Sequence, residues 1–437
     1  MSDYIVHTNS DIKKMLKVSR VKSIEGLFSE IPESLRAKPL NLPKGKSQLE
    51  VRRIFDSYAK SNKVFDTIMR GAGAYNHYIP PVVTHLSARE EFVTAYTPYQ
   101  AEMSQGILQS IYEYQTMIAN LTGMDISNAS LYDGATAAAE AVSMCMERNR
   151  KKVIVSVNIN PETLKVLKTH LPPFGMEIIL TGNRYRTNPE EIKSLLADDI
   201  AAVYLEQPNF YGIIEDAEAI GAIVEQTKAN YIMGVNPISL AVLKSPAECG
   251  ADIAVGEGQP LGMALSFGGP YLGFLAAKEK LMRKMPGRIV GETVDSNGKR
   301  AFVLTLQARE QHIRREKALS NICSNQALCA LKAAIYLAAN GPEGLREVAS
   351  QCVSKAHYAK QAFINTGLMS AITDDEFFHE FPLKTALPAD EILDALEKKG
   401  ILGGLKLDDH TILWCITEMV TRKEIDRAAR IMGRIRK

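Results

Sequence analysis

The sequence predicts an α/β fold, in which a large domain with a mainly parallel sheet lies between an N-terminal helical arm and a smaller C-terminal α+β domain. Between residues 151 and 255, short apolar runs such as VIVSV and AAVYLEQ alternate with longer amphipathic segments. This alternation is typical of βαβ units around a buried parallel sheet. We expect residues 1–125 to form the arm and an interface segment, residues 126–335 the large domain, and residues 336–437 the C-terminal domain.

The first part of the chain carries helix signals. Apolar residues recur at roughly helical spacing after Asp11, and Ile31-Pro32 ends that pattern. Ser47 and Glu50 form a capping-box pattern at the start of SQLEVRRIFDSYAKSN. The arm is therefore expected to consist of short helices.

Residues 71–100 mix aromatic and histidine residues with Gly and Pro and show neither a strand nor a helix period. An ordered loop is expected here. Aromatic residues with polar tips commonly line interfaces and ligand sites. A tightly packed cover over the core is an equal alternative for this segment.

Residues 104–121 form an amphipathic helical pattern that ends at Gly123. After it, residues 129–136 lead into an Ala-rich helical segment. The backbone N–H groups of residues 134–136 could face an anion from that helix N-terminus. Capping by Asp133 or Thr136 explains the same pattern equally well.

The stretch from Gly256 to Gly273, GEGQPLGMALSFGGPYLG, follows a short buried strand and holds six glycines. Ligands of parallel sheets bind beyond the carboxyl ends of the strands, so this loop lies where an active site is expected. Between Gly256 and Tyr271 it contains no Lys, Cys or His. A loop placed for chemistry thus lacks a reactive group.

After this loop we expect the polar loop GRIVGETVDSNGKR, the strand AFVLTL and a helix from about Arg309 to Asn340. The start of that helix is dense in charge, which a solvated helix face would explain. Beyond Gly341, alternating helical and strand patterns predict the smaller α+β domain.

Composition excludes several classes of function. The chain has 52 basic and 50 acidic residues and a net charge of +2, so neither nucleic acid nor an anionic membrane is an expected partner. The six cysteines form no C-x-x-C pair, which argues against a zinc ribbon or a disulfide framework, and no metal is expected. With no signal-peptide pattern and no long apolar run, a cytoplasmic protein is expected.

Several long motifs carry a resemblance: GAGAYNHYIP, TAYTPYQAEMSQGILQ, EYQT, YLEQPNFYG, FGGPYLGF and REQHIRREKALSNICSNQAL. Together they closely resemble the amino-terminal half of glycine dehydrogenase (decarboxylating), the P-protein family of the glycine cleavage system. The resemblance implies the fold type I architecture of pyridoxal-phosphate (PLP) enzymes. Some bacteria split this enzyme into two homologous chains, and this one resembles the first; the family expectation is a tetramer with two of each.

In the second, catalytic chain, a D-G-A-N segment supplies the Asp that holds the pyridine nitrogen and an H-K pair supplies the Schiff-base lysine. Here the matching residues are Met233-Gly234-Val235-Asn236 and Gln259-Pro260. Met233 and Pro260 cannot replace a carboxylate and an amine. We therefore expect no catalytic residue in this chain and no PLP bound through its own lysine, with Lys244 and Lys278 as the nearest, weak alternatives.

The resemblance implies that the assembled pair decarboxylates glycine and passes the aminomethyl group to the lipoyl group of the H carrier protein, with PLP held by the partner, subunit 2. The alternatives are an independent PLP-dependent decarboxylase or aminotransferase, and a purely structural subunit. Candidates for contacts to the partner's cofactor are Tyr96, Thr97, Tyr99, Gln100 and Thr293. Candidates for substrate, carrier or interface contacts are His77, Tyr78, Arg309, His312, Arg314 and Arg315, with simple interface packing as the alternative for each.

Overall fold

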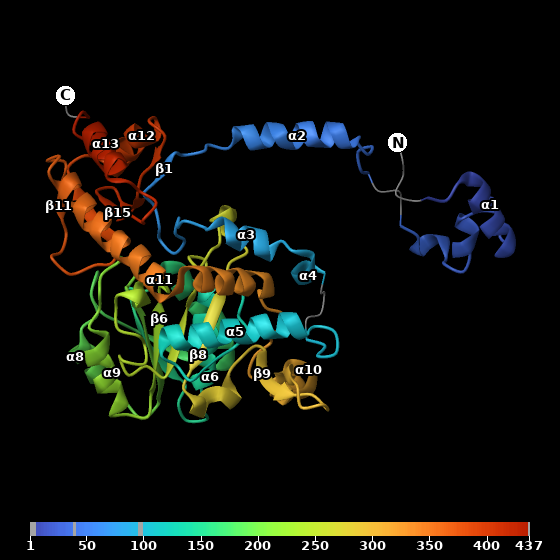
Figure 1. The fold of residues 1–437 in the computed structure, drawn as a ribbon, viewed down its shortest axis with the longest axis horizontal. Coiled ribbons are helices and arrows are strands. Elements are labelled where there is room, and N and C mark those ends of the chain that lie inside the picture. The colour runs from blue at the N-terminus through green and yellow to red at the C-terminus, as the bar shows by residue number, and fades with distance from the viewer. Residues whose placement is uncertain (1–5, 38–40, 95–98, 436–437) are drawn as a thin grey trace. The chain divides into compact units, whose positions relative to one another are not determined.

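The structure is a computed structural model that describes residues 6–37, 41–94 and 99–435 (Figure 1). The chain divides into two compact units, residues 1–64 and residues 65–437. The limits of the three domains proposed from the sequence remain a prediction.

The first unit contains the helices α1 (Asn9–Val18) and α2 (Gln48–Ser61). The side chain of Ser47 accepts the N–H of Glu50, and the Glu50 carboxylate accepts the N–H of Ser47, which confirms the predicted capping box. None of the described residues of this unit is buried. Its helices therefore have no core of their own.

The main sheet of the second unit has seven strands in the order β2-β8-β7-β6-β5-β3-β4. The strands β3 to β7 run parallel, whereas β8 is antiparallel to β7 and β2 is antiparallel to β8. The predicted mainly parallel sheet is confirmed. The strands are β2 (Ile126–Ser127), β3 (Lys152–Ser156), β4 (Glu177–Thr181), β5 (Ile200–Gln207), β6 (Asn230–Val235), β7 (Ile253–Glu257) and β8 (Gly273–Ala277).

Helices cover both faces of this sheet (Figure 1). One face packs against α6 (Gly134–Cys145) and α7 (Pro161–His170). The other face packs against α5 (Gln105–Thr122), α8 (Pro189–Leu195), α9 (Ala217–Glu225) and the first half of α11 (Ala327–Ile364). Gly123 ends α5 in a left-handed conformation, as predicted.

The C-terminal part of the chain forms a four-stranded sheet in the order β11-β12-β15-β14, packed against the end of α11 and two further helices. The strand β1, which precedes the main sheet in the sequence, pairs in parallel with β13 of this C-terminal part. The elements are β1 (Thr67–Ile68), β11 (Met369–Ala371), β12 (Glu380–Thr385), α12 (Ala389–Glu397), β13 (Ile401–Leu402), β14 (Leu405–Asp408), β15 (Thr411–Cys415) and α13 (Arg422–Met432).

Three local predictions are wrong. The segment 71–100 includes the helices α3 (Pro81–Ser87) and α4 (Glu90–Val93), which are too short to show a period. The expected polar loop 287–300 contains β9 (Ile289–Val294), paired with β10 (Arg300–Thr305). The charged segment from Arg309 forms only α10 (Gln311–Arg314) and short turns, because Arg315 takes a positive φ of 53°.

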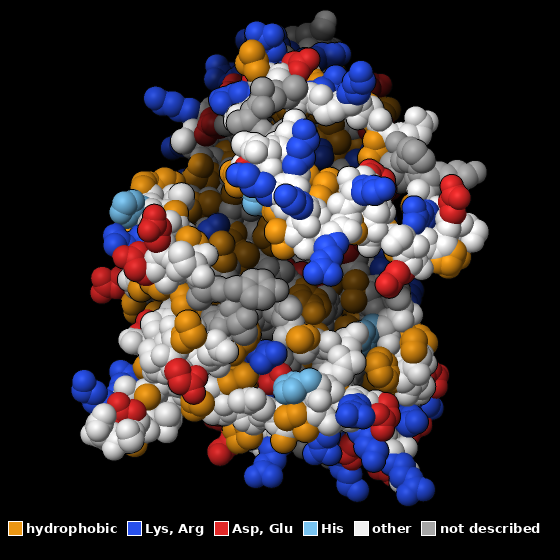
Figure 2. Space-filling view, turned by 90° about the vertical axis from the view of Figure 1, so that its right-hand side faces the viewer, with side chains coloured by type: hydrophobic (Ala, Val, Ile, Leu, Met, Phe, Trp, Pro, Cys, Tyr) orange, Lys and Arg blue, Asp and Glu red, His pale blue; other side chains and the backbone are white. Residues whose placement is uncertain are grey.

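The surface carries charges of both signs. On the face in Figure 2, Lys and Arg side chains, Asp and Glu side chains and exposed hydrophobic side chains all occur. This mixture agrees with the small net charge of +2. No described helix combines the length and the apolar character needed to cross a membrane.

Candidate functional site

A cavity of about 200 Å³ lies at the carboxyl ends of β5, β6 and β7. This is the edge of a parallel sheet at which ligands are expected. The N-terminus of α6, the start of α7 and the loop before α3 complete its walls. The lining includes Tyr75, Asp133, Gly134, Asn160, Tyr204, Glu206, Phe210, Gly234, Asn236, Glu257 and Tyr271.

Glu257, at the end of β7, bridges two walls of this cavity. One carboxylate oxygen accepts the N–H of Gly134 at 3.0 Å, and the other accepts the N–H groups of Leu272 and Gln259, both at 2.9 Å. Burial raises the pKa of this carboxyl to about 7, although the three N–H groups lower it. Its neighbour at the helix start, Asp133, accepts the N–H of Thr136 at 2.7 Å.

Glu206, from β5, lies on the opposite wall. Its carboxylate accepts the N–H of Asn160 at 2.7 Å and the hydroxyl of Tyr204 at 3.1 Å. Burial raises the pKa of Glu206 to about 7. This acidic group is therefore also held by partners within the chain.

A third buried carboxyl, Glu380 of β12, holds the loop that carries Tyr75. It accepts the N–H of Ala72 at 2.6 Å and the hydroxyl of Tyr75 at 2.7 Å. Burial, with a smaller contribution from the charge of Glu206, raises its pKa to about 7, although the hydrogen bonds from Ala72 and Tyr75 lower it. Three carboxyls with raised pKa values thus surround or support one cavity.

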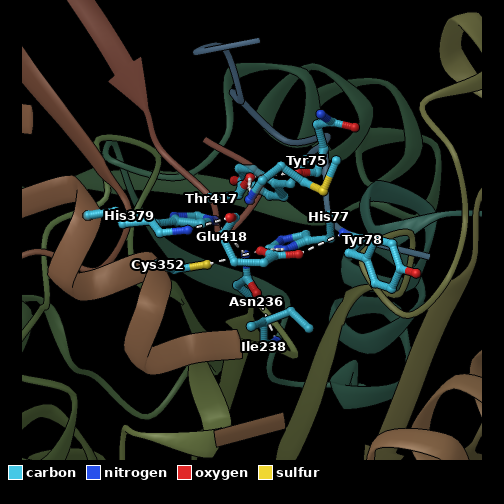
Figure 3. A network of polar contacts seen from close by, with 12 residues as sticks. Tyr75, His77, Tyr78, Asn236, Ile238, Cys352, His379, Thr417 and Glu418 are labelled. Atoms are coloured by element: carbon cyan, nitrogen blue, oxygen red, sulfur yellow. Dashed lines mark hydrogen bonds and ion pairs between the residues drawn. The ribbon is translucent and has the colours of Figure 1, made fainter. Parts of the chain in front are cut away.

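A second polar network fixes His77 and Tyr78 (Figure 3). The His77 Nδ1 atom lies 2.7 Å from one oxygen of Glu418, and the other oxygen accepts the N–H of Tyr78 at 2.7 Å. The thiol of Cys352 donates to Glu418 at 3.5 Å. Burial and the charge of Glu418 hold the pKa of this thiol well above its usual range.

The ligand atoms of His77, Cys352 and Glu418 lie within 4.8 Å of one another, which raises the question of a metal site. Two ligands of one tetrahedral zinc ion would lie roughly 3.2 Å apart or more, since each sits about 2 Å from the metal. The 2.7 Å contact between His77 and Glu418 is instead a hydrogen bond. The cluster is a hydrogen-bonded support for the loop before α3.

Asn236, on the pocket wall, contacts His379, whose ring stacks at 6.3 Å from that of His77. Its amide nitrogen lies 3.4 Å from His379 Nε2, and its amide oxygen accepts the N–H of Ile238 at 2.9 Å (Figure 3). His379 packs against the ring of Tyr75 with centroids 4.6 Å apart. Burial lowers the pKa of His379 well below its usual value, so its imidazole is neutral.

The two residues that the resemblance sets at the Asp and Lys positions of the catalytic chain are both buried. Met233 is on β6, fully buried in the core, and Pro260 is buried in the turn after β7. The alternative lysines lie elsewhere. Lys244 is exposed and pairs with Glu218 at 2.5 Å, and Lys278 pairs at 3.2 Å with Asp252, which precedes β7 at the opposite end of that strand.

Arg288 connects two of the candidates, Tyr99 and, through Glu310, His312. Its guanidinium lies 4.4 Å from the centroid of the Tyr99 ring, and it pairs with Glu310 at 3.4 Å. His312 lies 3.5 Å from the same Glu310. Tyr99 is half-buried, Gln100 is exposed, and Tyr96 and Thr97 lie outside the described residues.

The other candidates differ in exposure and in whether their side chains form hydrogen bonds within the chain. Arg309 is half-buried and donates to the carbonyl oxygens of Leu306, Met285 and Gly287, so it supports the backbone. Arg314 and Arg315 are exposed, and Arg314 donates to the carbonyl of Ala308 at 3.1 Å. Thr293 is exposed on β9, opposite Ala301.

Sequence reasoning missed the buried carboxyls of the pocket. Glu257 is adjacent to Gly256 in the loop that the sequence singled out, and Glu206 is in the strand AAVYLEQ. A signal was present, because an acidic residue at the carboxyl end of a buried strand faces the ligand edge. The contact between Glu257 and Gly134 spans 123 positions and depends on the tertiary fold.

The architecture and the position of the pocket define the class as fold type I, the fold of PLP-dependent enzymes. Glutamate decarboxylase from Lactobacillus brevis matches 95% of this chain and 97% of its own chain with a TM-score of 0.68, at 13% identity, which shows the fold alone. The chain belongs to the glycine cleavage system P-protein family, which it matches over residues 2–432.

Curated relatives and a crystal structure agree with this family. A protein of Desulfitobacterium hafniense named "Probable glycine dehydrogenase (decarboxylating) subunit 1" is 48% identical over 99% of this chain and 100% of its own length. A protein of the same name from Carboxydothermus hydrogenoformans is 49% identical over 98% and 99%. The crystal structure of glycine decarboxylase (P-protein) in inhibitor-bound form matches with a TM-score of 0.93 and 40% identity, covering 99% of this chain and 100% of that chain.

The pocket of this chain does not fit PLP. Among the described residues that line it, none is a lysine, and Met233, which the resemblance sets at the pyridine-binding Asp position, is a buried thioether. The helix N-terminus that would receive a phosphate is already bonded to Glu257 and Asp133. We therefore derive no step through PLP in this pocket.

Proposed function

We propose that this chain is the subunit of the P-protein that binds no PLP, and that it works only together with a homologous second subunit. The assembled pair decarboxylates glycine and transfers the aminomethyl group to the lipoyl group of the H carrier protein. Full-length relatives named subunit 1 support this proposal. The observation that carries it is the pocket in which Glu257 occupies the helix N-terminus and no lining residue among those described is a lysine.

On this proposal the partner holds PLP and this chain completes the partner's site. Fold type I sites lie at dimer interfaces, so a chain without its own cofactor can still contribute contacts. Tyr99, Gln100 and Thr293 are half-buried or exposed, and they remain candidates for those contacts together with Tyr96 and Thr97. The setting we propose is the cytoplasm, which suits the six free cysteines.

The first part of the N-terminal arm, residues 1–64, is our proposed holding element for the partner. Its described residues are all at least partly exposed, including large apolar side chains such as Leu27, Phe28, Phe55 and Tyr58. Leaving this much apolar surface in water is unfavourable, whereas burying it against a partner is favourable. The arm therefore supports an obligate assembly.

The second group of candidates is proposed to form the surface for substrate and carrier. Tyr78 is 54% exposed, although its backbone N–H is bonded to Glu418. Its side chain therefore faces solvent from a fixed backbone position. His312, Arg314 and Arg315 are exposed and suit an acidic carrier or an anionic group. His77 and Arg309 are engaged within the chain, and we propose that they hold this surface in place.

Separate and mixed subunits test the proposal. The isolated chain, supplied with PLP, is expected to show no internal-aldimine absorbance and no exchange of bicarbonate into glycine, whereas mixing with subunit 2 should produce both. A yellow, borohydride-reducible adduct on the isolated chain would overturn the proposal. That result would favour an independent PLP enzyme.

A second experiment separates a site-completing role from a purely structural one. Tyr96→Phe and Tyr99→Phe should lower turnover of the assembled enzyme without changing assembly. Tyr112→Phe is the matched control, because this half-buried ring packs 5.3 Å from Phe302 beside Tyr99's apolar cluster. Unchanged turnover in both test variants would favour the structural role.

A further inference from the structure

The N-terminus of α6 lies in a position at which proteins with parallel sheets commonly bind an anion. The helix is 12 residues long, begins at Gly134 and lies at the carboxyl edge of the parallel sheet. Helix N-termini in this position carry unpaired N–H groups and a partial positive charge, and in α/β proteins they bind the phosphates of cofactors. In this chain the position is filled from within.

The carboxylate of Glu257 makes the contacts that oxygens of a bound phosphate would make. It accepts backbone N–H groups from three separate places: Gly134 at the helix start, Gln259 in the following turn and Leu272 before β8. Backbone donors converging on one carboxylate form a concave anion site. The side chain that fills it is carried by the adjacent strand, β7.

We propose that Glu257 is a built-in substitute for the cofactor's phosphate, which keeps the vestigial pocket closed to phosphate-bearing ligands. This inference concerns the pocket of this chain alone, so it stands even if the proposed pairing with a second subunit fails. The closure of the phosphate position by Glu257 is separate from the absence of a lysine at position 260. Restoring a lysine would not reopen the phosphate position.

Two features of the surroundings support the proposal that the Glu257 carboxylate replaces a phosphate. Gly134 leaves no spare room, because a Cβ atom added there would lie 3.0 Å from the Cβ and from the backbone N of Glu257. Asp133 already caps another N–H of the first helical turn, that of Thr136. A phosphate would therefore have to displace Glu257 and lie next to a second carboxylate, which like-charge repulsion opposes.

Phosphate binding by variants of the full-length chain tests the inference. Glu257→Ala should bind one inorganic phosphate per chain in a calorimetric titration, and its thermal midpoint should rise with phosphate concentration. The wild-type chain should show neither effect. Glu162→Ala is the matched control: it removes a carboxylate that lines the same cavity but bonds the Lys165 amine at 2.7 Å, and it should behave as the wild type.

A second measurement covers the case in which Glu257→Ala does not fold. Glu257→Gln keeps the shape of the side chain, but one of its two oxygens becomes an NH2 group that cannot accept a hydrogen bond, so hydrogen exchange should become at least about tenfold faster at the Gly134 amide or at the Gln259 and Leu272 amides. Exchange at Thr136, capped by Asp133, should stay the same. Unchanged exchange at all three amides, equal phosphate binding by the wild-type chain, or a folded Glu257→Ala that binds no phosphate would each overturn the inference.

Discussion

The carboxylate of Glu257 accepts the backbone N–H of Gly134 at 3.0 Å and so joins the end of β7 to the start of α6. This contact lies where a PLP-dependent enzyme of the same fold would bind its cofactor. Together with the N–H groups of Gln259 and Leu272, it holds this wall of the pocket by bonds within the chain. The contact also makes the local packing sensitive to small changes.

Gly134→Ala is predicted to destabilise the chain. The added Cβ would meet Glu257 at 3.0 Å and the carbonyl carbon of Gly256 at 3.1 Å, so strands and helix must shift apart. Overpacking of this kind typically costs about 1–3 kcal/mol, which urea unfolding can measure. Gly106→Ala is the control, since a Cβ there meets nothing within 4 Å and should be neutral or stabilising. Equal effects of the two changes would contradict the prediction.

The stability of the chain is predicted to fall as the pH rises from about 5 to 8. Burial raises the pKa of Glu206, Glu257 and Glu380 to about 7, so the folded state holds these protons more tightly than the unfolded state. A group of this kind contributes its full stability below the unfolded pKa of 4.5 and loses it as the pH passes 7.

Glu206→Gln isolates one of these contributions. The amide resembles the protonated acid, because it can accept the N–H of Asn160 and donate to the hydroxyl of Tyr204. The free energy of unfolding of this variant, measured across the same pH range, should fall less steeply than that of the wild type. Parallel curves would show that Glu206 does not titrate as described.

Arg309→Lys is predicted to loosen the charged segment. The guanidinium joins the carbonyl oxygens of Leu306, Met285 and Gly287, and a single ammonium cannot replace this planar set of donors. Hydrogen exchange and limited proteolysis between residues 306 and 321 should both become faster. Arg315→Lys, at an exposed position, should leave both rates unchanged. Equal rates in the two variants would count against this role.

Removal of residues 1–64 is predicted to spare the remaining unit and to weaken assembly. No described residue of this segment is buried, so residues 65–437 should keep their thermal midpoint within a few degrees. Binding to subunit 2, followed by size-exclusion chromatography and calorimetry, should fall by at least about tenfold. A truncated chain that assembles with full affinity would refute the proposed role of the arm.

The sequence predicts the main sheet well because strands of a buried parallel sheet form continuous apolar runs, as in β5 and β6. It also predicts α5, whose amphipathic pattern ends at the left-handed Gly123. It fails for residues 309–326, where high helix propensity gives way to the turn at Arg315 and to the contacts of Arg288 with Tyr99 and Glu310. Tertiary contacts decide that segment, and local propensity does not.

The pocket shows the same division between local and long-range information. The departures at positions 233 and 260 are inferred from the resemblance to the catalytic chain, and the structure places both residues in buried positions. The roles of Glu206, Glu257 and Glu380 depend on partners far along the chain: Asn160, Gly134 and Tyr75. Such pairs become visible only when strand register and loop paths are known.

The location of PLP in the assembled enzyme tests the central claim most directly. The complex of this chain with subunit 2 would be loaded with PLP, reduced with borohydride, and digested for peptide mass spectrometry. We predict a phosphopyridoxyl label on a lysine of subunit 2 and none on this chain. A stoichiometric label on Lys244, Lys278 or any other lysine of this chain would contradict the account.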